Sequence, residues 1–315
     1  MNTRYIFIAV GILVCLAGTG TAQNVSIDPV TAPQQNTTGP VPPPGVSPPE
    51  PWTLDASRAE NVLIGVPAYI WHHGCGPTAV GMVVGYYDGM GYPDLIPGNT
   101  STQTTAVNQA IASWDNSSNP QHYEDYSEPI ESGQPAPLPD KSEPPPGDEH
   151  VSNCIADFME TSWSARGNFY GWSWSSDIGP AFTDYVNLVA PMYTPSWSPF
   201  WYGTGTWDLL RNEIDAGRPL VFLVDSSGDG NTDHFVTVIG YRDSNGYPEY
   251  ACRDTWYPTV RWARLREMSS SYGWGVWGGT TFTLSGGTPV PALSGFGIGI
   301  LLVLAGIGLI RRKKI

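Results

Sequence analysis

The chain has 315 residues, with 29 acidic residues against 15 lysines and arginines, and a formal net charge of -14. Hydrophobic residues make up 41% of the sequence, which is enough for a sizeable core and excludes a wholly disordered chain. Five of the basic residues lie at the two ends, so the body between them is more acidic than the whole. Such a body would repel a phosphate backbone, and we therefore expect no nucleic acid partner.

The N-terminus has the pattern of a secretory signal. An arginine precedes an apolar run that ends at Leu16, and small residues follow as far as Ala22. This order of charged, apolar and small residues predicts a signal peptide over residues 1–22 and export of the body. Residues 23–52 are rich in Pro, Thr, Gln and Ser, a composition that predicts an extended spacer.

Helices are expected first in the body and strands afterwards. Apolar residues at helical spacing predict helices over Cys75–Asp88, Thr104–Trp114, Ser152–Trp163, Asp177–Val189 and Thr206–Ala216. Short β-branched or aromatic runs predict strands over Leu220–Val224, His234–Tyr241, Tyr250–Thr255, Val260–Arg264 and Gly275–Leu284. Asn245-Gly246 is a hairpin signal between two of these strands. The order predicts an α+β domain over residues 53–287, interrupted by an acidic, Pro-rich insertion at 128–149.

A polar loop between the first two predicted strands carries oxygen-bearing side chains at alternate positions. The candidate ligands are Asp225, Ser227, Asp229 and Asp233. This is the first part of a calcium loop, but the closing Glu is missing because Val236 occupies the twelfth position. The stretch is therefore either a plain connecting loop or a Ca²⁺ site that stiffens the start of the next strand. We expect no required cofactor.

The C-terminus begins with Pro289-Val290-Pro291 and ends in two arginines and two lysines. The apolar stretch between them has about 18 residues, enough to cross a bilayer with the basic end in the cytoplasm. It reads either as a simple membrane anchor or as a sorting segment. Residues 288–315 resemble the PEP-CTERM class of bacterial tails, which a membrane sortase cuts, although the motif departs from Pro-Glu-Pro. In both cases we expect the body at the cell surface or outside the cell.

Outside the leader, the chain has three cysteines: Cys75, Cys154 and Cys252. An odd count leaves at least one thiol unpaired, and the simplest pairing joins Cys154 to Cys252, with other pairings open. Cys75 lies between Gly74 and Gly76 where a helix should begin. The glycines allow a substrate close to the backbone, and the helix N-terminus favours a thiolate. The competing interpretation is a buried core cysteine.

A nucleophilic thiol needs a base, and His234 is the candidate because it opens an apolar strand. The hairpin that follows returns the chain to Asp254 at the end of the next strand. Asp254 can thus lie beside His234 and orient its imidazole, as in nucleophile–base–orienter sites. Alternatively, His234 is a structural histidine and Asp254 a turn residue.

Together these motifs resemble papain-fold cysteine peptidases of the bacteriocin-leader-peptidase type (family C thirty-nine-like). The resemblance rests on Cys-Gly-Pro-Thr-Ala at a helix start, Gly-Arg-Pro before a strand, Asp-His-Phe-Val-Thr-Val-Ile-Gly-Tyr, and Asp-Thr-Trp. It implies helices that carry Cys75 as nucleophile and an antiparallel sheet that carries His234 as base and Asp254 as orienter. The glutamine that the family places shortly before its cysteine is missing here. Tyr69, His72 or His73 could replace it as a hydrogen-bond donor to the oxyanion, and His72 is our candidate.

The sequence therefore predicts an exported thiol hydrolase that cleaves peptide bonds in peptides or proteins. Amide transfer stays open, because an amine can take the same thioester. The alternative is a non-catalytic surface module that uses the same scaffold for adhesion or ligand display, with or without stabilisation by calcium. The missing glutamine and the insertion at 128–149 favour this alternative.

Overall fold

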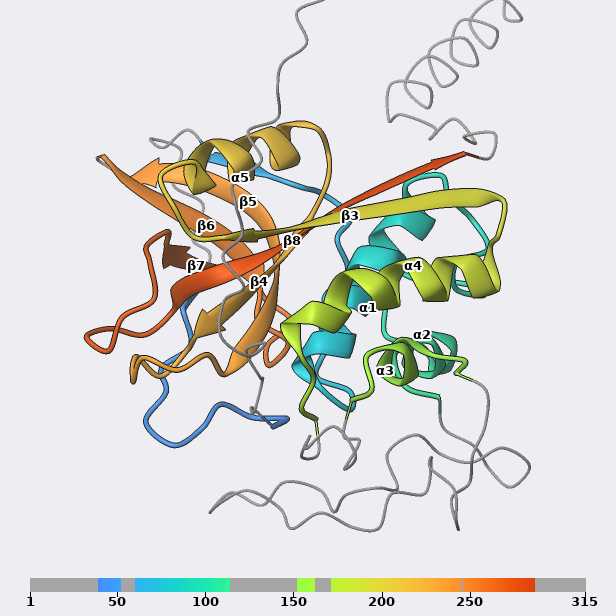
Figure 1. Cartoon of the computed structure of the whole chain (residues 1–315), viewed down its shortest axis with the longest axis horizontal. Helices are drawn as coiled ribbons and strands as arrows, with labels where there is room; N and C mark the ends of the chain where they lie inside the picture. The colour runs from blue at the N-terminus through green and yellow to red at the C-terminus, as the bar shows by residue number, and fades with distance from the viewer. Residues whose placement is uncertain (1–38, 52–59, 114–151, 162–170, 245, 287–315) are drawn as a thin grey trace, which may run out of the picture. The chain divides into compact units, whose positions relative to one another are not determined.

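The computed structural model describes residues 39–51, 60–113, 152–161, 171–244 and 246–286, all of which belong to one compact unit of the chain. The predicted signal peptide, the insertion at 128–149 and the sorting segment lie outside these residues. Figure 1 shows the helices between residues 75 and 189 gathered on one side and most of an antiparallel sheet on the other. The described residues thus confirm a mixed fold of helices and antiparallel strands.

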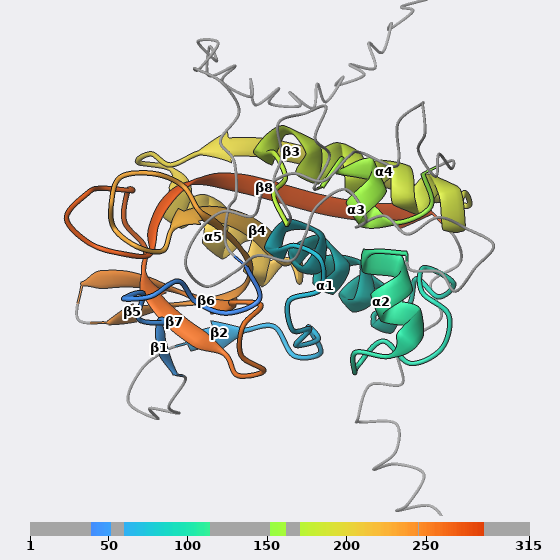
Figure 2. The same ribbon diagram turned by 90° about the horizontal axis from the view of Figure 1, so that it is seen from below.

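Five helices lie where the sequence predicts them, although two are shorter than expected. Their bounds are α1 (Cys75–Gly89), α2 (Thr105–Ile111), α3 (Ile155–Phe158), α4 (Ile178–Val189) and α5 (Thr206–Asp215). Helix α1 is buried along almost its whole length and packs against α2, α3, α4 and the sheet. Figure 2 shows α1 in the middle of the molecule. A helix that is apolar all round belongs in such a central position.

The strands of the described residues form one antiparallel sheet. Their bounds are β1 (Glu50–Pro51), β2 (Glu60–Val62), β3 (Tyr193–Trp201), β4 (Leu220–Asp225), β5 (His234–Ser244), β6 (Tyr247–Arg253), β7 (Arg261–Arg264) and β8 (Gly275–Gly286). The strand order is β1-β7-β6-β5-β4-β8-β3, with β2 paired to β5 outside this path. The predicted hairpin joins β5 to β6, where Ser244 lies opposite Tyr247.

Strand β3 was not predicted, and its sequence explains why. It contains Pro195 and Pro199, and proline usually argues against a strand because it cannot donate to the ladder. Here the strand lies at the edge of the sheet, where it pairs with β8 on one side only. An edge strand tolerates prolines whose missing N–H would otherwise face a neighbour.

The two faces of the sheet pack against two different hydrophobic clusters. Along β4, Val221 and Leu223 belong to the cluster formed with α1–α4, whereas Phe222 and Val224 belong to a second cluster that includes the buried side of α5. In β5, Phe235 belongs to the first cluster and Val236 to the second. This alternation follows from the two-residue repeat of a strand.

Candidate active site

Cys75 is the first residue of α1 and is fully buried. The turn before it is held by Thr78, whose hydroxyl donates to Gly74 O at 2.7 Å and accepts from His72 N at 2.9 Å. Gly74 has φ 143°, and a Cβ atom there would lie 2.9 Å from Pro77 Cδ. Only glycine fits this position, so the chain enters the helix in one fixed path.

The segment around Cys75 lies beside the start of β5 and the end of β6. Gly76 lies close to Phe235, the residue that follows His234. A Cβ atom at position 76 would lie only 3.2 Å from Phe235 Cδ2. Thr237 Oγ1 donates to Ala79 O at 3.0 Å, and the amide of Trp71 donates to Thr255 O at 2.6 Å. The fold therefore brings together the three segments that the sequence marks as functional.

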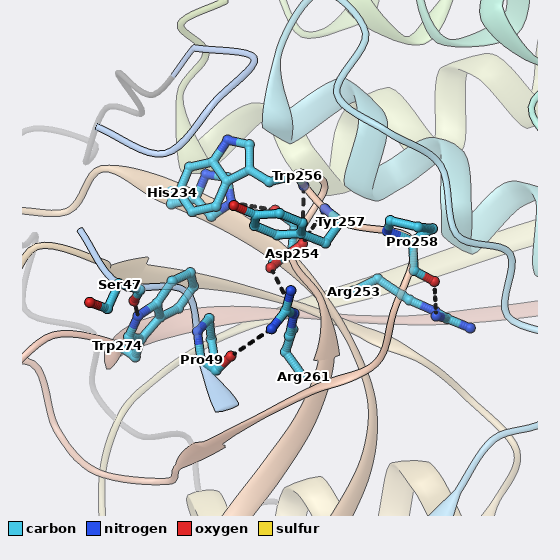
Figure 3. Close-up of polar contacts among 10 residues, drawn as sticks. All are labelled: Ser47, Pro49, His234, Arg253, Asp254, Trp256, Tyr257, Pro258, Arg261 and Trp274. Atoms are coloured by element: carbon cyan, nitrogen blue, oxygen red, sulfur yellow. Dashed lines mark hydrogen bonds and ion pairs between the residues drawn. The ribbon is translucent and has the colours of Figure 1, made fainter. Parts of the chain in front are cut away.

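The imidazole of His234 is fully buried at the first position of β5. Its Nε2 lies 2.7 Å from the main-chain oxygen of Asp254 (Figure 3). A carbonyl oxygen can only accept, so Nε2 carries the proton and Nδ1 carries the lone pair. Burial lowers the pKa of His234 to about 3, against a smaller upward effect of that hydrogen bond. The ring is therefore neutral near pH 7, in the tautomer that has its lone pair on Nδ1.

The carboxylate of Asp254 contacts the turn that follows β6 and an arginine of β7. Its Oδ1 accepts from the amides of Trp256 at 3.0 Å and Tyr257 at 2.9 Å, and its Oδ2 lies 3.7 Å from Arg261 Nε (Figure 3). Burial raises the pKa of Asp254, partly offset by these amides. The side chain thus shapes the turn after β6, and the main-chain carbonyl of the same residue contacts His234.

Two tryptophans enclose His234. The ring of Trp256 stacks on the imidazole with centroids 3.8 Å apart and planes 10° apart, and Trp274 meets it edge-on at 6.1 Å. The sequence alone predicts neither tryptophan beside the base. The available signal was the position of Trp256, two residues after Asp254, where a turn can fold the indole back over the strand start.

His72, the candidate oxyanion donor, is partly buried, and burial lowers its pKa. A hydrogen bond with the backbone of Ala112 acts in the opposite direction. The imidazole is thus neutral near pH 7, and it hydrogen-bonds the backbone at the C-terminal end of α2. A role for His72 at the oxyanion stays a prediction.

The candidate calcium loop joins β4 to β5, and its carboxylates bind the loop itself. Asp225 accepts from the amides of Gly228 at 2.6 Å and Gly230 at 2.7 Å, and from the hydroxyl of Ser227. Asp233 accepts from the amide and hydroxyl of Ser226, and burial raises its pKa to about 7. Within the residues that the structure describes, no three His, Cys, Asp or Glu side chains gather where they could hold a metal ion. Calcium binding by this loop stays a prediction.

The disulfide between Cys154 and Cys252 is not formed in the structure. Cys154 and Cys252 are both free and buried. Cys154 belongs to the cluster around α1, and Cys252 to the cluster on the other face of the sheet. The sheet separates the two thiols, which excludes a bond without a rearranged core. Burial raises the pKa of both thiols well above the ordinary value.

The central helix begins with a cysteine and packs on an antiparallel sheet, in which one strand begins with a histidine. This is the framework expected of a thiol peptidase. Comparison with family models supports this class. The model of the Peptidase_C39 like family matches residues 63–280, and the chain belongs to this family. No curated protein matches the chain. The family suggests a cysteine peptidase, which would act on peptides or proteins.

The predicted membrane segment lies in a part of the chain that the structure does not describe. Across the described ranges, none of the helices is long and apolar enough to cross a membrane. The predicted span lies in residues 288–315, outside those ranges.

Proposed function

We propose that the protein is an exported thiol hydrolase that cleaves peptide bonds with Cys75 as nucleophile and His234 as base. The observation that carries this proposal is the fixed imidazole: Nε2 donates to the Asp254 carbonyl, and this tautomer has its lone pair on Nδ1. This base opens the strand that packs against the helix of Cys75. Membership in the peptidase family gives independent support.

The reaction follows from these groups. Nδ1 of His234 takes the proton of the Cys75 thiol, and the sulfur attacks the carbonyl carbon of the scissile bond. Negative charge develops on the carbonyl oxygen, where the N-terminal amides of α1 and the positive end of its dipole stabilise it. The imidazolium then gives its proton to the leaving amine as the C–N bond breaks.

The remaining thioester is released by water, with His234 again acting as base. Water loses a proton to Nδ1 and attacks the acyl carbon, and the thiol of Cys75 is regenerated. An amine in place of this water would give amide transfer. In this scheme Asp254 is a positioning residue, since its carboxylate holds the turn that aims its own carbonyl at Nε2.

The placement outside the cell rests on the sequence at both ends. Residues 1–22 would direct export, and residues 288–315 would hold the body at the membrane until a sortase cuts the tail.

The test is cleavage of a proteome-derived peptide library by the full chain, with products mapped by mass spectrometry. We expect Cys75→Ala and His234→Ala to reduce cleavage at least about 10³-fold, because each removes a participant in bond breaking. Cys252→Ala is the matched control, since it removes a buried thiol from the other face of the sheet. Unchanged cleavage by Cys75→Ala would overturn the proposal.

A further inference from the structure

The proline-rich segment 39–51, which the sequence assigns to the spacer, lies against the two tryptophans that enclose His234. The indole N–H of Trp256 donates to Gly39 O at 3.0 Å, and that of Trp274 donates to Ser47 O at 2.7 Å. Figure 3 shows the second of these contacts beside the imidazole. We call residues 39–51 the strap.

Further contacts fix the strap along its length. Its last two residues form β1, which pairs with β7, and Arg261 Nη1 donates to Pro49 O at 3.3 Å (Figure 3). Pro49 is buried, and Val46 packs against the apolar cluster that contains both tryptophans. The strap is therefore part of the folded domain, although its composition predicts a solvated linker.

The chemistry of the two partners explains the fit. A proline-rich chain has few N–H groups, so many of its carbonyls are left for outside donors. A buried indole N–H needs an acceptor. The strap supplies an acceptor to each indole, and these are the same two indoles that contact His234 by stacking and by an edge.

We propose that the strap is a positioning element of the candidate active site, which holds Trp256 and Trp274 in the orientations that enclose His234. Its catalytic consequence rests on the proposed function. With the strap docked, the imidazole is kept dry, stacked and bonded to the carbonyl of Asp254. With the strap undocked, both indole N–H groups lose their acceptors, the tryptophans turn towards other partners, and the imidazole loses its fixed orientation.

The first variant undocks the strap in the full chain without altering a residue that touches the imidazole. Val46→Asp places a charge against the apolar cluster, whereas Val41→Asp makes the same change at a strap residue that is 58% exposed. The readout is the NMR signal of the His234 ring, assigned by its loss in His234→Gln. Stacking at 3.8 Å produces an upfield ring-current shift of the imidazole C–H protons, and the bond to Asp254 slows exchange of Nε2–H.

We expect Val46→Asp to remove most of the upfield shift and the slowly exchanging N–H signal, and Val41→Asp to leave both in place. Trp274→Phe is the second variant, for the case in which Val46→Asp fails to fold. It keeps an aromatic edge but deletes the donor to Ser47 O, and should reduce the shift in the same direction.

A ring signal that is the same in Val46→Asp and the unaltered protein would overturn the inference. Equal effects of Val46→Asp and Val41→Asp would also overturn it, because the effect would then be general. Since this readout needs no turnover, it separates the two proposals. If Val46→Asp changes the His234 signal while the unaltered protein cleaves no peptide, the proposed function fails and the inference about the strap stands.

Discussion

Burial of His234 should make the folded protein lose stability in mild acid. The histidine pKa is 6.5 without the protein environment and falls to about 3 in the fold, because burial disfavours the charged ring. Below pH 6.5 the unfolded chain takes up a proton that the folded chain does not. The stabilisation is thus fully present above pH 6.5 and is lost as the pH falls towards the folded value.

The magnitude follows from the difference between the two pKa values. Each pH unit in this window costs about 1.4 kcal/mol, so acidification from pH 6.5 to 5 should lower the free energy of unfolding by about 2 kcal/mol. Asp233 acts with the opposite sign, because its pKa is raised from 3.8 to about 7 and its folded form gains a proton in the same range. The whole-protein curve therefore mixes the two effects.

The assay removes this mixture by comparison with His234→Gln, whose side chain retains an N–H donor for Asp254 O. Urea unfolding at pH 7 and pH 5 gives the free energy of unfolding of each protein. We expect the unaltered protein to lose about 2 kcal/mol more than His234→Gln over this interval. Equal losses would refute a neutral, buried imidazole.

Three further predictions test the surroundings of the site. Gly74→Ala should destabilise the fold by about 1–3 kcal/mol in urea unfolding, because its φ is 143° and its Cβ has no room, whereas Gly203→Ala, with nothing within 4 Å, should change little. Asp254→Asn should keep the rate of peptide cleavage within about threefold of the unaltered protein, since its amide oxygen still accepts from the turn. Asp254→Ala should lower both cleavage and stability, because it leaves two amides without an acceptor. A large loss of cleavage in Asp254→Asn would instead indicate that the charge acts on the imidazole directly. Millimolar CaCl₂ against EGTA should move the Tm by less than about 2 °C, because Asp225 is occupied by loop amides, and a larger rise would place a cation there.

The elements that carry the candidate site could be predicted because their patterns are local. Helix α1 follows a glycine-flanked cysteine with apolar residues at helical spacing, and β5 is a continuous apolar run that opens with His234. The two-residue hairpin between β5 and β6 has its own turn signal. Together they fix which segments meet, since the hairpin returns the chain to the strand start.

The contacts at His234 could not be predicted, because they depend on a turn and on a distant segment. The carboxylate of Asp254 accepts hydrogen bonds from the amides of residues 256 and 257. The main-chain carbonyl of Asp254 is therefore the group that contacts His234. The strap has no apolar repeat, and it binds largely through main-chain carbonyls that no sequence pattern marks. The edge strand β3 was missed for a similar reason, since its prolines are acceptable only at a position that the whole sheet defines.

The central claim is that Cys75 is a nucleophile activated by His234. Iodoacetamide labelling of the full chain, with the labelled cysteines located by mass spectrometry, tests it most directly. Cys75, Cys154 and Cys252 are all fully buried, so exposure alone predicts no difference among them. We expect Cys75 to react at least ten times faster than the other two at pH 7, and His234→Gln to abolish that advantage. Equal, slow labelling of all three cysteines, or an unchanged rate at Cys75 in His234→Gln, would contradict the account.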